Sequence, residues 1–291
     1  MAGPPSAAAD RPDGDDRYTH GHHAIIVASH ARRTAANSAA FLLPRLHPGM
    51  ELLDVGCGPG SITIDLAELV APSLVVGVDR EPEVLAGARA AAVERGVGNV
   101  RFEPADVYEL PFPDDSFDVV FAHQLLQHLT RPRAALAEMA RVARPRGLVA
   151  ARDADFGTMV HAPDVALLGR WRELYHQVAR ANRAEPDAGR YLRGWALDAG
   201  LEDVQASASA WHYASDEARR AWAELWAVRD TEGAFAGQAV ETNLSDRTEL
   251  GQLAAAWRDW ARQPGGFFAF LHGEVLARAP DRAPDTDGDR P

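Results

Sequence analysis

Glu51-Leu-Leu-Asp-Val-Gly-Cys-Gly-Pro-Gly60 is the stretch that decides the fold of this chain. The apolar run Met50–Val55 predicts a buried strand, because short apolar runs that end at turn residues are typical of strands covered on both faces. The three glycines allow a sharp turn and a close approach of the backbone to a ligand. A helical pattern follows at Ser61–Val70. The stretch therefore predicts a strand, a glycine-rich turn and a helix.

The same alternation continues through the first half of the chain. Further strands are expected at Leu74–Val78, Val100–Glu103, Phe117–Ala122 and Gly147–Arg152, and further helices at Pro82–Arg95 and Pro132–Val142. Strands that alternate with helices predict a parallel sheet with helices on both faces. The expected fold class is therefore α/β, with a doubly wound, Rossmann-like sheet.

The second half of the chain is mainly helical. Helices are expected in Asp164–Arg183, Gly189–Ala199 and Asp216–Arg262, and two late strands at Val204–His212 and Phe267–Leu276. The long helical stretches then form an inserted cap above the carboxyl edge of the sheet, where doubly wound folds bind ligands. Five of the seven tryptophans fall in Asp164–Arg183 and Asp216–Arg262 and are expected to form the core of the cap. An aromatic substrate pocket or a dimer face is the alternative.

Composition excludes several classes of protein. The net charge of −12 argues against a nucleic-acid partner, and all 30 basic residues are arginine, so no lysine is present for a Schiff base or a P-loop. The single cysteine, Cys57, excludes a disulfide scaffold and multi-thiolate metal sites. No apolar run approaches the ~18 residues of a membrane helix, and the first residues lack the features of a signal peptide. A cytoplasmic location is expected.

Three carboxylates follow the ends of neighbouring predicted strands. Asp54 would repel a pyrophosphate and suits a ligand with an ammonium group, and Ser61 stands where the dinucleotide fingerprint needs glycine. Asp79 can accept both hydroxyls of a ribose. Asp106 can accept from an adenine amino group. An amino acid, a ribose and an adenine together describe S-adenosylmethionine.

Several segments resemble the class I S-adenosylmethionine-dependent methyltransferases, nearest the UbiE-like quinone C-methyltransferases. They are ELLDVGCGPGSIT, VVGVDREPEVL, VRFEPADVYELPFPDDSFDVVFAHQLLQHL and LAEMARVARPRGLVAARD. The resemblance covers residues 18–155 strongly and the rest in topology only. It implies a seven-stranded sheet of order 3-2-1-4-5-7-6 with strand 7 antiparallel, in which the two late strands are strands 6 and 7.

The resemblance also implies which residues bind the cofactor: Asp54, Gly56, Cys57, Gly58, Asp79, Arg80, Asp106, Val107, His123 and Gln124. The glycine turn and its aspartate would line the methionine part. The aspartate after the second strand would hold the ribose, and the pair after the third strand would meet the adenine edge. The pair after the fourth strand would lie near the transferred methyl group. Arg80 would flank the adenine plane, although most members have a small or hydrophobic residue there.

The stretch Tyr18-Thr-His-Gly-His-His23 precedes a helix that is expected to run to about Leu43. Related enzymes use this segment as a lid, so Tyr18 or His22 is expected to touch the cofactor or the substrate. Arg32 or Arg33 would pair with the methionine carboxylate. The histidine cluster also raises a metal site as an alternative, but adjacent histidines rarely share one ion without a scaffold. No metal is expected.

The domain organisation follows from these assignments. A disordered tail is expected at 1–17, a cofactor-binding core with a lid helix at 18–155, the rest of the core with its helical cap at 156–279, and a second disordered tail at 280–291. The tails are rich in proline, aspartate, glycine and alanine and cannot bury enough apolar surface to order themselves. A homodimer through the cap remains open.

The expected reaction moves a methyl group to an O, N or C nucleophile of a small, hydrophobic or aromatic molecule, such as a quinone-like or natural-product scaffold. Orientation alone can supply much of the rate, and a histidine base is optional. Candidate bases are His22, His23, His123 and His128, although the last also suits a packing role. The alternatives are a protein that binds the cofactor without methyl transfer, a peptide or protein acceptor, and an NAD-dependent oxidoreductase. Asp54 and Ser61 argue against the last.

Overall fold

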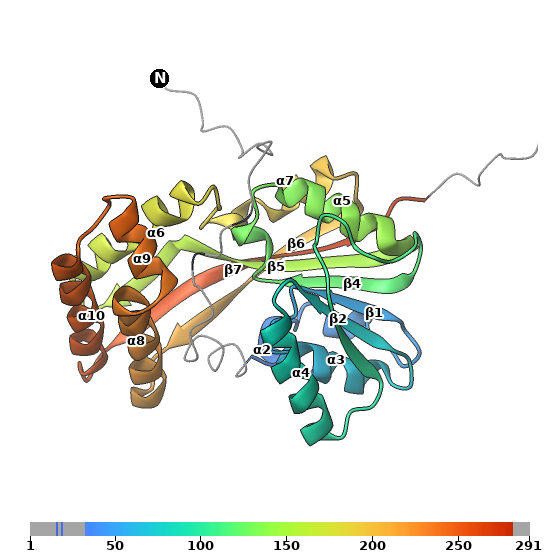
Figure 1. Cartoon of the computed structure of the whole chain (residues 1–291), viewed down its shortest axis with the longest axis horizontal. Coiled ribbons are helices and arrows are strands. Elements are labelled where there is room, and N and C mark those ends of the chain that lie inside the picture. The colour runs from blue at the N-terminus through green and yellow to red at the C-terminus, as the bar shows by residue number, and fades with distance from the viewer. Residues whose placement is uncertain (1–15, 17–18, 20–32, 282–291) are drawn as a thin grey trace, which may run out of the picture.

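The computed structural model describes residues 16, 19 and 33–281 of the chain. Within this part, seven strands form one sheet of order β3-β2-β1-β4-β5-β7-β6 (Figure 1). The strands are β1 (Leu52–Val55), β2 (Val75–Asp79), β3 (Val100–Pro104), β4 (Phe117–His123), β5 (Ala143–Ala162), β6 (Glu202–Tyr213) and β7 (Phe267–Arg278). β1 to β5 pair in parallel, and β7 runs antiparallel between β5 and β6. The predicted fold class and strand order are confirmed.

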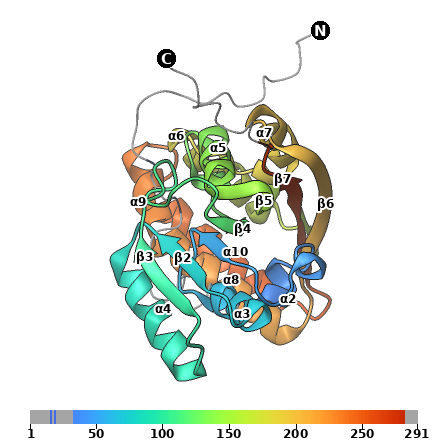
Figure 2. The same ribbon diagram turned by 90° about the vertical axis from the view of Figure 1, so that its right-hand side faces the viewer.

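Helices cover both faces of the parallel part of the sheet. Alternate residues of β1 point to opposite sides: Leu52 packs with α3 (Ser61–Val70), and Leu53 packs with α5 (Pro132–Val142) and α7 (Leu192–Asp198). α4 (Pro82–Arg95) lies on the α3 side, against β3. Figure 2 shows the sheet between these two helical layers. Both faces are apolar because both are buried, as the continuous apolar runs predict.

β5 is much longer than the predicted strand, which ended at Arg152. It pairs with β4 as far as Arg152 opposite His123, and then continues to Ala162 with β7 as its partner. Figure 1 shows β5, β6 and β7 running together past the ends of β1 to β4. The continuation has no apolar run because much of it is buried on one face only, so the sequence pattern did not reveal it.

The cap helices pack on this extension of the sheet. They are α6 (Ala166–Ala181), α8 (Asp216–Thr231), α9 (Ala234–Glu241) and α10 (Arg247–Ala261). Phe156, Phe268 and Phe270 of the strands meet five buried tryptophans of the helices, namely Trp171, Trp222, Trp226, Trp257 and Trp260. The tryptophans therefore form the cap core, as predicted, and the cap shares the sheet of the core. Among the residues that the structure describes, no helix is long and apolar enough to span a membrane.

The prediction of a helix running to about Leu43 is wrong. The described part contains the short α2 (Ala35–Ser38) and a 3₁₀ turn, η1 (Leu43–Arg45). Thr34 starts α2 with a capping box, and the residue before Pro44 is disfavoured in helical geometry. Leu42 is fully buried against the sheet, so packing rather than periodicity sets this segment. The tails predicted at 1–17 and 280–291 lie mostly outside the described residues, and the boundary at 155 stays a prediction.

Gly273 of β7 allows a close backbone approach between the extended sheet and a neighbouring turn. An added Cβ would lie directly against the carbonyl oxygen of Gly189, in the turn η3 (Ala188–Arg190). We expect Gly273→Ala to lower the free energy of unfolding by about 1–3 kcal/mol, because overpacked cores shift backbone. Denaturant unfolding measures this.

Gly251→Ala is the matched control for that substitution. Gly251 lies on the exposed side of α10 with nothing within 4 Å of an added Cβ. Alanine there should leave stability unchanged or raise it by up to about 1 kcal/mol, because alanine is the better helix former. Equal effects of the two substitutions would contradict the close contact.

Candidate active site

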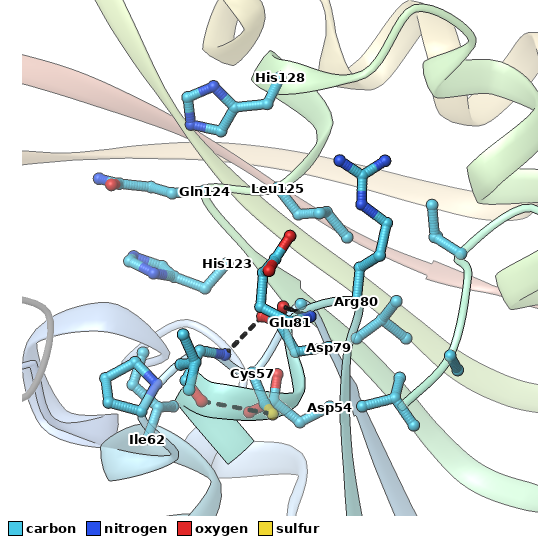
Figure 3. A pocket seen from close by; sticks show the side chains of 18 of the residues that line it. Asp54, Cys57, Ile62, Asp79, Arg80, Glu81, His123, Gln124, Leu125 and His128 are labelled. Atoms are coloured by element: carbon cyan, nitrogen blue, oxygen red, sulfur yellow. Dashed lines mark hydrogen bonds between the residues drawn. The ribbon is translucent and has the colours of Figure 1, made fainter. Parts of the chain in front are cut away.

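A pocket lies at the carboxyl edge of the parallel strands. Its lining includes the glycine turn after β1, the end of β2, the loop after β3, the end of β4 and, beyond it, Leu125, His128 and Leu129. Figure 3 shows His123, Gln124 and His128 along one side, with Asp79 and Arg80 across from them. All ten cofactor-site residues expected from the segments that resemble methyltransferases line this pocket, namely Asp54, Gly56, Cys57, Gly58, Asp79, Arg80, Asp106, Val107, His123 and Gln124.

The turn after β1 takes a conformation that favours glycine. Gly56, Gly58 and Gly60 have φ of 73°, 54° and 76°, in the left-handed region. An added Cβ at Gly60 would lie 2.7 Å from the ring of Phe102, whereas one at Gly58 would meet nothing within 4 Å. Gly60 is therefore required for packing, and Gly58 leaves its backbone open toward the pocket.

Asp79 is held in a fixed direction at the end of β2. Its Oδ2 accepts a hydrogen bond of 3.0 Å from the amide of Gly58, and its Oδ1 accepts one of 3.1 Å from the amide of Glu81. A carboxylate offers about four acceptor positions, so both oxygens keep capacity for further donors. The two amides therefore fix the orientation of the carboxylate and leave it able to accept further hydrogen bonds.

Asp54 is the buried acid of the pocket, with 2% of its surface exposed. Burial raises the pKa of this carboxyl to about 7, the hydroxyl of Thr63 at 2.6 Å lowers it, and the nearby charge of Asp79 raises it further. A cation placed beside Asp54 would favour its ionised form. The site is therefore suited to a positively charged group.

Asp106 and Arg80 lie at the outer rim. Asp106 is exposed, and its Oδ1 accepts from the amide of Tyr108 at 2.9 Å. The exposed Arg80 donates through Nη2 to the backbone oxygen of Asp16 at 3.1 Å. Val107 packs against the sheet core beside them. The rim thus combines an oriented carboxylate with an apolar side chain.

Comparisons with known proteins agree with this geometry. A family model described as a methyltransferase domain matches residues 46–213. A methyltransferase of Schizosaccharomyces pombe, described as uncharacterized, is 32% identical over 274 residues, which are 89% of this chain and 95% of the yeast protein. The chain belongs to the methyltransferase-domain family. It is an S-adenosylmethionine-dependent methyltransferase of class I.

Two further comparisons show a partial sequence similarity and a shared fold. The ubiquinone/menaquinone biosynthesis C-methyltransferase UbiE of Azotobacter vinelandii is 36% identical over 129 residues, covering 44% of this chain and 49% of UbiE. The solved structure of YcgJ from Bacillus subtilis has a TM-score of 0.56 at 19% identity and covers 84% of this chain and 98% of YcgJ. At that identity, the second likeness shows the shared fold.

His123 and His128 are the two candidate bases that the structure describes. Each makes a hydrogen bond through its Nε2. In His123, at the end of β4, Nε2 accepts from the guanidinium of Arg152 at 2.9 Å, because arginine only donates. In His128, Nε2 accepts from the amide nitrogen of Gln127 at 3.0 Å. Burial, with the charges of Arg229 and Arg33, lowers the pKa of His128 to about 3. His128 is therefore neutral near pH 7, and its bound nitrogen is a weak base.

A buried polar cluster behind His123 has no counterpart in the sequence analysis. Arg152 is 1% exposed and lies between His123, Ser209 and the carboxylate of Glu274, whose Oε1 is 3.3 Å from the arginine Nε. Ser207 also donates to Glu274, at 2.7 Å. Ser207 and Ser209 are two residues apart on β6, so both side chains point to the same face of the sheet. This spacing is the sign of the cluster that the sequence contains. The partners of Arg152 lie on β4, β6 and β7, so the sequence alone could not show that they meet.

Other predicted residues lie outside the described part. Tyr18, His22, His23 and Arg32 are among them, so their roles stay predictions. Arg33 is described, and its Nη2 donates to the side-chain oxygen of Gln124 at 2.7 Å. In the described ranges, no group of three or more His, Cys, Asp or Glu side chains is placed to hold a metal ion.

The pKa of Asp54 gives a prediction for the cofactor-free methyltransferase. Between the ordinary pKa of 3.8 and the folded value of about 7, the folded protein holds a proton that the unfolded chain has released. The free energy of unfolding should therefore fall as pH rises through this range, by about 1.4 kcal/mol per unit from this group. Asp54→Asn should remove that contribution.

Denaturant unfolding at several pH values measures the slope, with Asp106→Asn as the exposed control from the same pocket. Some slope should remain in Asp54→Asn, because burial also raises the pKa of Asp153 to about 7. A slope unchanged from that of the wild type would contradict the buried protonated state.

The Arg152–Glu274 pair gives a second prediction. Arg152→Met should lower the free energy of unfolding by about 3–5 kcal/mol, because it leaves a buried carboxylate without its cation. The double variant Arg152→Met, Glu274→Leu should cost less than the sum of the single changes. A control at the exposed pair Arg101–Glu103 should change stability by about 1 kcal/mol or less. Additive effects at the buried pair would refute the coupling.

Proposed function

We propose that this methyltransferase transfers the methyl group to an O, N or C nucleophile of a small, hydrophobic or aromatic molecule. The observation that carries the proposal is the convergence of Asp54, Asp79 and Asp106 on one pocket, from the ends of three neighbouring strands. Each acid suits a different part of S-adenosylmethionine. Its charged amino acid, its ribose and its adenine are spaced in the same order as the acids.

The residues of the pocket fit this cofactor. The amides of Gly58 and Glu81 orient Asp79, which would accept from the two ribose hydroxyls. Asp54 would be ionised by the ammonium group beside it, since a nearby cation repays the cost of its burial. The open backbone of Gly58 and its neighbours Gly56 and Cys57 would line the methionine part.

The adenine end would lie at the rim of the pocket. Asp106 would accept from the amino group of adenine and the backbone of Val107 would meet its edge, while Arg80 would flank the ring. Ile62 and Val84 add apolar lining to the same pocket. This arrangement supports a flat, partly apolar site closed at one edge by polar groups.

The cofactor supplies a methyl group that is already activated by its sulfonium. The protein's work is then to hold the acceptor in line and to exclude water, and positioning of this kind supplies on the order of 7–11 kcal/mol in model reactions. His123 and Gln124, at the end of β4, would stand beside the reacting groups. Their bonds to Arg152 and Arg33 suit them to orient the acceptor.

The cap supports a particular class of acceptor. On β6, the ring of Trp211 lies near the pocket end that holds Gln124: its centre is 4.4 Å from that of His272, whose Nε2 is hydrogen-bonded to Gln124. Rings of this kind favour flat apolar molecules. The similarity to UbiE, named for ubiquinone/menaquinone biosynthesis, supports a small conjugated acceptor over a macromolecule.

The test has two parts. Calorimetric titration with S-adenosylmethionine and S-adenosylhomocysteine should show binding at tens of micromolar or tighter. Incubation with methyl-labelled S-adenosylmethionine and a panel of quinols, phenols and amines should move the label to a product. Absence of binding would reject the proposal, and binding without label transfer to small molecules or added peptides would leave a cofactor-binding protein.

Asp79→Asn tests the assignment of the ribose. The amide keeps one acceptor oxygen but loses the charge and the second acceptor, so S-adenosylhomocysteine should bind about 10–100-fold more weakly. Glu103→Gln, on β3 outside the pocket lining, is the control and should bind as the wild type does. Titration calorimetry gives the affinities, and thermal melting checks folding. Wild-type affinity in Asp79→Asn would remove this residue from the site.

A further inference from the structure

Arg152 is a buried cation directly behind the pocket. It is 1% exposed and lies on β5 opposite His123 of β4, which lines the pocket. Its Nη1 donates to Nε2 of His123 at 2.9 Å. Burial lowers the pKa of Arg152 to about 10, and Glu274 acts against that change. The guanidinium therefore stays charged near pH 7, and it directs one N–H at the ring of His123.

The other contacts of Arg152 hold its guanidinium in place. Nε and Nη2 donate to the hydroxyl of Ser209 at 3.2 and 3.1 Å, and Nε lies 3.3 Å from Oε1 of Glu274. The same hydroxyl donates to Glu274, so one carboxylate anchors both groups. The guanidinium carbon is also 4.9 Å from the centre of the Trp211 ring. Glu274 compensates the charge of Arg152, and the contacts from β6 and β7 fix the direction of Nη1.

This hydrogen bond fixes the state of the His123 ring. Arginine has no acceptor, so Nε2 is the accepting nitrogen and the neutral ring carries its hydrogen on Nδ1. A second proton would have to enter at Nε2, where it would break the bond and face the guanidinium cation. His123 is also only 6% exposed, and burial disfavours a charged ring. Both effects favour the neutral ring.

The neighbouring histidines are neutral for similar reasons. The ring of His272 on β7 stacks on that of His123 with centres 6.5 Å apart, and burial lowers its pKa well below the ordinary value. Arg33 donates to the side-chain oxygen of Gln124, so the amide nitrogen of Gln124 donates to Nε2 of His272 at 2.7 Å. Burial also lowers the pKa of His128, in the 3₁₀ turn η2 (Leu126–His128), to about 3. The arginines thus act on a group of neutral rings.

The carboxylates beside Arg152 or in the pocket make hydrogen bonds with other groups. Glu274, Asp153, Asp54 and Asp79 accept from Ser209, the amide of Gln127, Thr63 and the amide of Gly58, in that order. The group that meets Nε2 of His123 is the guanidinium of Arg152. The charge that acts most directly on this nitrogen is therefore positive.

We propose that Arg152 is a positioning residue for methyl transfer, which holds His123 as a neutral ring with its hydrogen on Nδ1 and so prevents a ring cation beside the sulfonium. This inference rests on the proposed function, because it assigns a role within the same site. A cation near the sulfonium would weaken binding of S-adenosylmethionine, whereas S-adenosylhomocysteine has no charge on its sulfur. In this state His123 takes no proton from the acceptor.

The first test reads the state of the ring. The full chain is labelled with nitrogen-15 in its histidines and saturated with S-adenosylhomocysteine, and His123→Gln identifies the His123 signals. We expect a neutral ring with its hydrogen on Nδ1 at about pH 7 and also at about pH 5.5, below the ordinary histidine pKa of about 6.5. A charged ring at the lower pH, or a hydrogen on Nε2 of the neutral ring, would overturn the inference.

The double variant Arg152→Met, Glu274→Leu removes both charges of the buried pair. Without the guanidinium, His123 should take up a proton by about pH 5.5. The matched control is Arg101→Met, Glu103→Leu, which removes an exposed pair on β3 outside the pocket lining and should leave His123 as in the wild type. A ring that stays neutral in the folded double variant would show that Arg152 does not set its state.

The second test compares the two forms of the cofactor. Both carry the same ammonium, ribose and adenine, so the ratio of their affinities isolates the sulfonium and cancels the titration of Asp54. Titration calorimetry should give the wild-type protein equal ratios at about pH 7.5 and about pH 5.5. In the double variant S-adenosylmethionine should lose about tenfold at the lower pH, because a ring with the ordinary pKa must first release its proton. Equal ratios in the folded double variant would overturn the inference.

A second variant covers the case in which the apolar pair fails to fold. Arg152→Gln, Glu274→Gln keeps hydrogen-bonding groups for the buried serines but carries no charge, and its amide oxygen can accept from a protonated ring. His123 and the affinity ratio should respond to pH as in the first double variant. Thermal melting at both pH values identifies unfolded variants. A merely structural role of Arg152 would lower the melting temperature and leave the ratio unchanged.

The outcomes separate the two proposals. If S-adenosylhomocysteine and S-adenosylmethionine do not bind, the proposed function fails. If they bind and the state of His123 and the affinity ratio do not depend on Arg152, the inference fails and the proposed function stands.

Discussion

The parallel pairing of β1 with β2 is the constraint on which the site depends. Val55 lies opposite Val78, so the glycine turn after β1 and the acid at the end of β2 reach the same edge together. The amide of Gly58 then lies 3.0 Å from Oδ2 of Asp79. A register shift of one residue would turn each side chain of the shifted strand to the opposite face of the sheet and would separate these groups. Strand pairing thus positions both the backbone and the charge of the pocket at this edge.

The second organising feature is the continuation of β5, β6 and β7 beyond the other strands. One face of this extension carries the cap core, and its inner end carries the buried pair Arg152–Glu274. Arg152 also bonds His123 at the end of β4. The polar cluster therefore joins the pocket to the cap through side chains of adjacent strands. The pocket and the cap belong to one continuous sheet.

Hydrogen-bond donors set the chemistry of three histidines in and beside the pocket, namely His123, His128 and His272. The guanidinium of Arg152 and the amides of Gln124 and Gln127 each donate to a histidine Nε2, and protonation at that atom would break the bond. Burial works in the same direction, since it disfavours the charged ring. A neutral histidine whose Nε2 accepts a hydrogen bond carries its hydrogen on Nδ1 and can donate there. This arrangement agrees with a reaction whose methyl group needs no further activation.

The sequence by itself determined the parallel sheet, the glycine turn and the acids Asp54, Asp79 and Asp106, because strand, turn and helix signals are local and parallel strands share one carboxyl edge. It did not reveal the length of β5, the short α2, or the contacts of Arg152, Glu274 and His272. Those depend on pairing between residues far apart in the chain: 122 positions separate Arg152 from Glu274. Only the tertiary structure decided which polar groups are buried together, since burial and hydrogen-bond partners arise when the strands assemble.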